Sequence, residues 1–194
     1  GQYWFVTITP YGKDFEPNVP DKNIVIKSFC ELSGIIGINS MGWRYDPVIV
    51  SKKYTVDHHI SAFEKIASQL YGCTETCIIS FVDLYEKVRR NAPEIREVSP
   101  SEQITLAKAF AEIGSRYGIK VKGCHENPAL AEYGIDISGC LNKVVYEKAL
   151  GTSLDMPKRR SQRECSCFFG TDIGAYNSCG HLCRYCYANA DTEV

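Results

Sequence analysis

The sequence predicts an α/β protein in which a partial TIM-barrel-like repeat of β-α units forms a parallel sheet and a cysteine-rich tail follows it. Short apolar runs rich in β-branched and aromatic residues alternate about four times with segments of helical periodicity, a pattern typical of a parallel sheet. Five of the ten cysteines lie within the 22 residues from Cys165 to Cys186. A full eight-stranded barrel needs roughly 250 residues. Only about 150 residues precede the tail, so a partial barrel or an open sheet is expected.

The first half of the chain is expected to form two strands and two helices. The apolar run at residues 3–9 predicts a buried strand, and a second strand is placed at residues 42–45, ending at Asp46-Pro47. Helical spacing of apolar residues predicts a helix at residues 21–33 that stops at Gly34. Another helix is expected to begin at Thr55 or Asp57 and to end at Gly72.

The second half repeats this alternation. Strands are expected at residues 77–82 and 119–123, and a charged helical segment at residues 84–91. Ser99-Pro100-Ser101-Glu102 is a capping box with proline at the first helical position, and it predicts a helix that ends at Gly118. The last helix is expected at residues 142–150, before Gly151.

Polar residues follow the expected strands, at the edge of the sheet where parallel α/β folds place their active sites. They are Thr9 after the first strand, Arg44 and Asp46 after the second, Ser80 and Asp83 after the third, and His125 and Glu126 after the fourth. Among them, Arg44, Asp46, Asp83 and Glu126 are the candidate catalytic residues. Alternatively, these residues cap helices and pair with one another, with Arg44 and Asp46 as a local salt bridge.

Composition excludes several classes of protein. The net charge is −1, so no overall basic field would hold a nucleic acid; the short basic run from Lys158 to Arg163 is interpreted as a solvated linker, with a contact to DNA left open as the alternative. No apolar run approaches the roughly 18 residues that span a bilayer. The chain opens at Gly1 without a secretory signal, which predicts an N-terminal truncation and a cytoplasmic location. In that reducing compartment clustered cysteines indicate metal binding or redox chemistry.

The tail contains Cys179-x3-Cys183-x2-Cys186, with Tyr185 before the last cysteine. Three thiolates at this spacing can each bind one iron of a 4Fe-4S cluster and leave the fourth iron open. Cys165 and Cys167 could supply a fourth thiolate and close the cluster. Zinc is the alternative, because it accepts four thiolates, or three with a histidine such as His181.

This spacing, together with the aromatic residue, resembles the cluster motif of radical S-adenosylmethionine enzymes, and Tyr-Cys-Tyr-Ala-Asn is similar to the spore photoproduct lyase branch. The resemblance implies a cluster at Cys179, Cys183 and Cys186 whose open iron binds S-adenosylmethionine, and a reductant such as ferredoxin or flavodoxin. Tyr185 and Asn177 are the candidate cofactor-binding residues. In that class the motif precedes most of the barrel, whereas here only eight residues follow it.

The whole chain resembles an uncharacterised bacterial family, domain of unknown function 1848. The stretches that carry the resemblance are Tyr11–Asp14, Pro17–Lys22, Trp43–Pro47, Ile79–Asp83, Tyr133–Ile135 and Asp172–Asn177. Members of that family are longer at the N-terminus, which supports the truncation. The family implies a barrel-like α/β part at residues 1–151 and an iron–sulfur-like cysteine tail at residues 152–194, and it supplies no substrate.

Two function classes therefore remain. The first is an enzyme that resembles radical S-adenosylmethionine enzymes, with the cysteine loop folded back over the strand ends. The second is a non-enzymatic protein whose closed iron–sulfur or zinc site serves electron transfer or stability. The other cysteines, Cys30, Cys73, Cys77, Cys124 and Cys140, are expected to be structural, because buried cysteine is commonly inert; a radical-quenching or ligating thiol is the alternative for Cys124 and Cys140. His58 and His59 are expected to be exposed.

Overall fold

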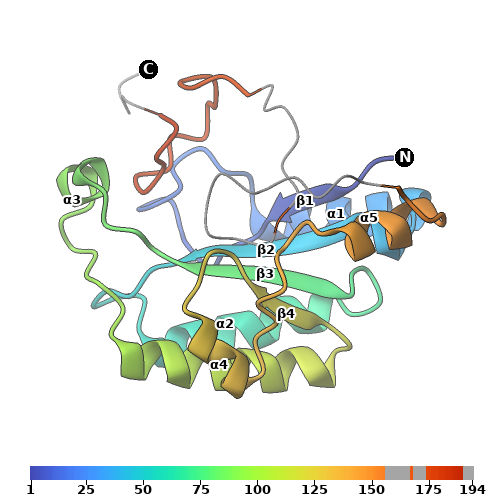
Figure 1. The fold of residues 1–194 in the computed structure, drawn as a ribbon. Helices are drawn as coiled ribbons and strands as arrows, with labels where there is room; N and C mark the ends of the chain where they lie inside the picture. Colours follow the sequence, from blue (N-terminus) through green and yellow to red (C-terminus); the bar gives the residue numbers. More distant parts are fainter. Residues whose placement is uncertain (156–166, 168–173, 190–194) are drawn as a thin grey trace.

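The computed structural model describes residues 1–155, 167 and 174–189, and its centre is a four-stranded parallel sheet (Figure 1). The strands are β1 (Trp4–Thr7), β2 (Met41–Val48), β3 (Thr76–Phe81) and β4 (Lys120–Gly123), paired in the order β1-β2-β3-β4. Their register aligns Thr7, Arg44, Ile78 and Lys122 across the sheet. The predicted α/β class and parallel sheet are confirmed.

Five α-helices and two 3-10 turns connect and cover the strands of the described chain. They are α1 (Lys22–Ile36), η1 (Ile38–Ser40), α2 (Val56–Gln69), α3 (Glu86–Asn91), α4 (Pro100–Arg116), η2 (Pro128–Tyr133) and α5 (Lys143–Leu150). α2 and α4 lie side by side beneath the sheet, and α5 packs against η1 (Figure 1). Within the described ranges, no helix is long and apolar enough to cross a membrane.

The predicted helix starts are confirmed by their caps. The Thr55 hydroxyl accepts the His58 amide at 3.2 Å at the start of α2. The capping box of α4 is complete, since the Glu102 carboxylate accepts the Ser99 amide at 3.1 Å and the Ser99 hydroxyl accepts the Glu102 amide at 3.4 Å. These contacts satisfy amides that the first helical turn leaves without partners.

Two predicted elements end too early, while the predicted ends of β1 at residue 9 and of α2 at Gly72 lie beyond the observed Thr7 and Gln69. α1 continues through Gly34 and ends at Ile36, before Gly37 with its left-handed φ of 91°; an interior glycine costs only about 1 kcal/mol, which the helix tolerates. β2 does not end at Asp46-Pro47 but continues to Val48, because the pairing with β3 shifts register between Tyr45 and Val48. Such an irregularity accommodates a proline, which has no amide hydrogen to donate.

Aromatic side chains form the core between the sheet and the helices. Trp43 of β2 stacks on Phe63 of α2 with ring centroids 4.7 Å apart, and Phe63 stacks on Phe110 of α4 at 4.1 Å. Because side chains alternate along a strand, Arg44 and Asp46 of β2 point to the opposite face of the sheet. That face, which we call the open face, carries the polar side chains discussed below.

His59 is buried, so the predicted exposed role is wrong for this residue. Its Nε2 lies 2.8 Å from the Ile49 carbonyl and its Nδ1 lies 2.8 Å from the Tyr45 hydroxyl. A carbonyl only accepts, so Nε2 carries the hydrogen and Tyr45 donates to Nδ1. Burial lowers the pKa of His59 to about 4. The reason is helical spacing: His59 lies four residues before Phe63, on the face of α2 that meets the core.

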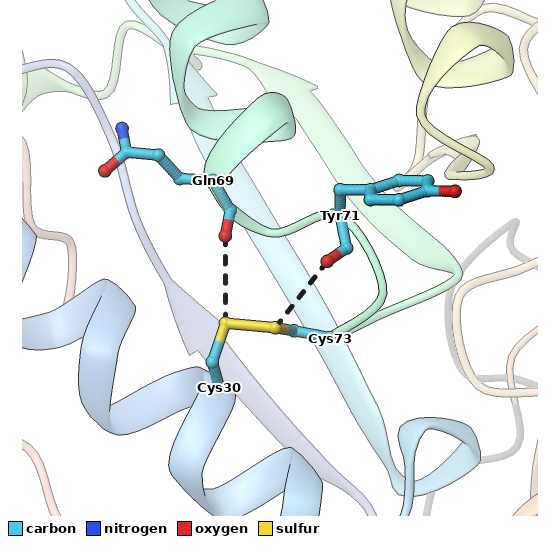
Figure 2. The surroundings of a disulfide bond; sticks show 4 residues. All are labelled: Cys30, Gln69, Tyr71 and Cys73. Carbon is cyan, nitrogen blue, oxygen red and sulfur yellow. Dashed lines mark hydrogen bonds between the residues drawn. A yellow bond between two sulfur atoms is a disulfide. The ribbon is translucent and has the colours of Figure 1, made fainter.

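Cys30 of α1 and Cys73, in the turn between α2 and β3, form a disulfide (Figure 2). The sequence predicts separate structural cysteines at these positions, and that prediction is wrong. Their 43-residue separation gives no local signal, and it is the packing of α1 beside the end of α2 that brings the two side chains together. The disulfide sulfurs carry no hydrogen and simply contact the carbonyl oxygens of Gln69 and Tyr71, at 3.8 and 3.9 Å.

Candidate functional site

Arg44, Asp46 and Ser80 lie together on the open face of the sheet. Arg44 donates to one Asp46 carboxylate oxygen from Nη2 at 2.6 Å and from Nε at 3.0 Å. The Ser80 hydroxyl donates to the other oxygen of the same carboxylate. The side chains of Arg44 and Asp46 are 30% and 19% exposed. The structure therefore has the local salt bridge that the sequence left as an alternative, in a position that solvent still reaches.

Glu126 lies at the carboxyl end of the sheet and has an unusual protonation equilibrium. Its Oε1 accepts the backbone amide of Phe81 at 2.8 Å. Burial, with smaller contributions from the charges of Asp83, Cys124 and Asp46, raises the pKa of Glu126 to about 7. A carboxyl group with such a pKa can both donate and accept a proton near neutral pH. Asp83 itself is exposed and accepts a hydrogen bond from the Tyr85 hydroxyl at 3.1 Å.

Three thiols meet on the open face, beside Arg44. Cys124 follows β4 and lies 3.9 Å from Arg44 Nη2. Cys124 packs against Cys140 and Cys167, and the sulfurs of those two lie 3.2 Å apart. Cys140 and Cys167 pack on Ile78 in the middle of the sheet. Cys167, predicted as a possible cluster ligand, is thus part of a second group of thiols, whereas Cys165 lies outside the described residues, as do Lys158 to Arg163.

The cysteine loop, residues 174–189, is held against the body by Arg184. The backbone amide of Arg184 donates to the Phe15 carbonyl at 3.0 Å, and its Nε donates to the Asn91 carbonyl at 2.9 Å. Its guanidinium pairs with Glu94 at 2.7 Å. Phe15 follows β1, and Asn91 and Glu94 follow β3 through α3. The loop therefore lies against the connections that leave the carboxyl ends of these strands (Figure 1).

Tyr185 fixes the loop at a second point. Its hydroxyl donates to the buried carboxylate of Glu16, which also accepts the Thr9 hydroxyl at 2.5 Å and pairs with the Lys22 ammonium. The ring of Tyr185 meets that of Tyr11 edge to face at 5.7 Å. Burial, followed by the charge of Glu16, raises the pKa of Tyr185, so the phenol keeps its proton and donates.

Glu16, Lys22 and Tyr11 were not predicted as site residues. A charged residue in a proline- and glycine-rich loop is ordinarily solvated, and the sequence does not show that Tyr185 reaches this loop from 169 positions away. One feature of the sequence pointed to this loop: Tyr11–Asp14 and Pro17–Lys22, the stretches on either side of Glu16, carry part of the family resemblance.

The three cysteines of the motif lie in one turn of the loop. Cys179 is exposed, while Cys183 and Cys186 are half-buried. Burial, then the charge of Glu16 and the neighbouring thiols Cys186 and Cys179, raises the pKa of Cys183 to about 11.

Backbone contacts shape this turn. Leu182 adopts the left-handed region with φ of 54°, and the side-chain Nδ2 of Asn189 donates to the Cys179 carbonyl at 2.8 Å. Asn177, also left-handed at φ of 58°, donates its backbone amide to Ala188 at 3.0 Å and closes the loop. An apolar residue with positive φ is uncommon, which indicates that tertiary contacts impose this conformation.

A cavity of about 340 Å³ lies where the loop meets the body, lined by Pro17, Asn18, Asn91, Leu182 and Arg184. Leu182 and Arg184 flank Cys183 in the sequence, so the cavity borders the cysteine turn. Asn18 donates from Nδ2 to the Gly180 carbonyl at 2.9 Å and forms one side of this contact.

No group of three or more His, Cys, Asp or Glu side chains in residues 1–155, 167 and 174–189 is arranged around a single point to hold one metal ion. The donor set of the loop is nevertheless three thiols, which is the chemistry of an iron–sulfur site. In a 4Fe-4S cluster each thiolate binds a different iron, so the sulfurs stand farther apart than the ligands of one ion.

The comparisons with known proteins identify the family. The sequence profile described as Domain of unknown function (DUF1848) matches residues 1–188. This match spans nearly the whole chain, so the chain belongs to that family and the resemblance found in the sequence is confirmed. No curated protein and no solved structure matches the chain significantly.

Proposed function

We propose that this member of the domain of unknown function 1848 family is an iron–sulfur protein that resembles radical S-adenosylmethionine enzymes. Cys179, Cys183 and Cys186 would each bind one iron of a 4Fe-4S cluster. Three thiolate ligands would leave one iron without a protein ligand, available to S-adenosylmethionine. When bound, such a cluster would supply reducing electrons for radical chemistry on that cofactor.

The observation that carries the proposal is the position of the cysteine turn. Arg184 and Tyr185, the two residues between Cys183 and Cys186, hold the turn against the connections after β1 and β3. Active sites of parallel α/β folds lie at this edge of the sheet. A turn that served stability alone would have no need to be anchored there.

The position of Cys167 favours an open iron over a cluster or zinc site closed by this cysteine, and the zinc measurement below tests a zinc site that takes His181 as its fourth ligand. A closed site needs a fourth protein ligand. Cys167 contacts Cys140 at 3.2 Å and packs on Ile78, on the open face of the sheet. Three thiols therefore remain at the loop among the described cysteines, which suits a cluster with one open position.

The chain's own residues would bind and orient a substrate. We assign proton transfer to Glu126, whose pKa of about 7 suits that role, and substrate positioning to Arg44, Asp46 and Asp83. Tyr185 and Asn177 would shape the cofactor pocket, Tyr185 by fixing the loop on Glu16 and Asn177 by closing its base. The four strands lie in the sheet in the order in which they occur in the sequence. This order suits part of a TIM barrel, in which the open face would point into the barrel.

The proposal has consequences for partners and location. Reduction of the cluster requires an electron donor such as ferredoxin or flavodoxin. A cytoplasmic location would keep the exposed thiol of Cys179 reduced, although a disulfide such as Cys30–Cys73 is uncommon in that compartment. The net charge of −1 makes a small molecule a better candidate substrate than a nucleic acid.

Anaerobic reconstitution tests the ligand set. The purified chain would be incubated with iron and sulfide, desalted, and its iron, sulfide and zinc measured. We expect about four irons and four sulfides per chain, and loss of most of both in Cys183→Ala. Cys77→Ala, which removes a buried thiol on the far face of the sheet, is the matched control and should keep the cluster. Stoichiometric zinc without sulfide would overturn the proposal in favour of a structural metal site.

A further inference from the structure

Cys124, Cys140 and Cys167 form a graded series of thiols that the proposed cluster does not use. Cys124 is half-buried at the carboxyl end of β4, whereas Cys140 and Cys167 are only 7% and 5% exposed. Cys124 packs against the cluster that holds the other two, and the Cys140 sulfur lies 3.2 Å from that of Cys167. One thiol therefore faces solvent, with two more behind it.

Each outer member of the series has a donor that stabilises a thiolate. Arg44 Nη2 lies 3.9 Å from Cys124 Sγ. The backbone amide of Cys140 donates to Cys167 Sγ at 3.1 Å. Hydrogen bonds from cationic or amide donors favour the charged form of an acceptor. Nucleophilic cysteines are found in partly exposed, electropositive surroundings of this kind.

We propose that Cys124, Cys140 and Cys167 form a thiol–disulfide exchange site that reduces a small-molecule disulfide. Cys124 is the attacking thiol, Cys140 resolves the mixed disulfide, and Cys167 receives the disulfide at the end. The site does not depend on the cluster at Cys179, Cys183 and Cys186.

The steps balance without a further oxidant. The Cys124 thiolate attacks one sulfur of R–S–S–R, the substrate S–S bond breaks, and the first R–S⁻ leaves and takes a proton. Cys140 attacks the Cys124 sulfur, and its proton passes to the departing second R–S⁻, which leaves as R–SH. Cys167 then attacks the Cys140 sulfur and releases its proton to solvent, which replaces the proton taken by the first R–S⁻, and Cys124 leaves as a thiolate. Two electrons have passed from two protein thiols to the substrate, which becomes two R–SH, and the protein holds a Cys140–Cys167 disulfide.

The ionisation of Cys124 agrees with this geometry. The hydrogen bond with Cys140, assisted by the charge of Arg44, lowers the pKa of Cys124 to about 7, while the pKa of Cys140 is raised. The accessible thiol is thus the one that ionises first. Cys77 offers the contrast, because burial on the other face raises its pKa.

The test treats the reduced full-length chain with oxidised glutathione, quenches it with an alkylating agent and maps each cysteine by mass spectrometry. Peptide mapping separates these thiols from the exposed ones of the loop. In the wild type we expect a Cys140–Cys167 disulfide and no glutathione left on Cys124. Cys140→Ser should stop at a stable Cys124–glutathione adduct.

Cys124→Ser should slow the oxidation of Cys140 and Cys167 by about tenfold or more, because it removes the accessible thiolate. Cys77→Ala is the control and should react as the wild type does. A Cys140→Ser protein without glutathione on Cys124, or a Cys124→Ser protein that forms the Cys140–Cys167 disulfide at the wild-type rate, would overturn the proposal. Circular dichroism of each variant establishes that it is folded.

Discussion

The disulfide between Cys30 and Cys73 allows a quantitative prediction about stability. We consider the double variant Cys30→Ala/Cys73→Ala, which removes the covalent link between α1 and the turn before β3 (Figure 2). The sulfurs make only long contacts to carbonyl oxygens, at 3.8 and 3.9 Å. Loss of the link itself should therefore dominate the change in free energy.

The magnitude follows from the length of the loop that the link closes. The two cysteines are 43 residues apart. The chain-entropy relation then gives a stabilisation of about 4 kcal/mol at 25 °C, through restriction of the unfolded chain. For a chain of this size, about 4 kcal/mol corresponds to a fall of roughly 8 to 16 °C in Tm.

Urea unfolding of wild type and double variant, each with and without a thiol reductant, measures the effect. Without reductant the variant should be less stable by about 4 kcal/mol. With reductant the two proteins should unfold at nearly the same urea concentration, because the wild type then lacks the link as well. A difference that persists under reduction, or a difference below about 1 kcal/mol without it, would refute the loop-entropy reasoning.

Three further predictions concern single side chains. The rate of Cys124 alkylation should reach half its maximum near pH 7, which is the pKa that Cys140 and Arg44 give this thiol. Arg44→Gln should move that midpoint to higher pH. An unchanged pH profile would show that Arg44 has no influence on the thiol. His59 has a pKa of about 4 in the folded chain, against 6.5 ordinarily. As the pH falls, the unfolded chain therefore binds a proton before the folded chain does. The free energy of unfolding should have its full value above about pH 6.5 and should fall by about 3 kcal/mol as the pH drops to about 4. His59→Gln should remove that part of the slope in urea titrations at several pH values, and an identical slope in both proteins would contradict the burial argument. Tyr185→Phe removes the hydrogen bond to Glu16, so the cysteine loop should dock more weakly by about 1.5 to 3 kcal/mol. Hydrogen exchange of the backbone amides of residues 174–189 should then be faster than in the wild type. Unchanged exchange would contradict the role of this hydrogen bond.

The fold was largely predictable because its signals are local. Thr55, Ser99 and Glu102 mark helix starts through contacts with residues three positions away, and apolar alternation locates the strands. The error at Gly34 arose where packing outweighs a helix preference of about 1 kcal/mol, and the error at Pro47 arose because a shift in pairing register lets the strand continue past the proline. His59 was misplaced for a related reason, since a polar residue on an apolar helical face is buried only if partners such as Tyr45 are present.

The site was predictable only in part, because it depends on contacts between distant residues. The motif of Cys179, Cys183 and Cys186 is visible within eight residues of sequence. The partnership of Tyr185 with Glu16 joins residues 169 positions apart, and that of Cys140 with Cys167 joins residues 27 apart. Neither partnership has a periodic or motif signature, so only the folded chain reveals them.

The most direct test of the proposed function is electron paramagnetic resonance of the reconstituted, reduced chain, recorded with and without S-adenosylmethionine. The account predicts a 4Fe-4S signal that shifts when the cofactor is added, because Cys179, Cys183 and Cys186 leave one iron open. A 4Fe-4S signal indifferent to the cofactor would contradict the open position and indicate a closed cluster.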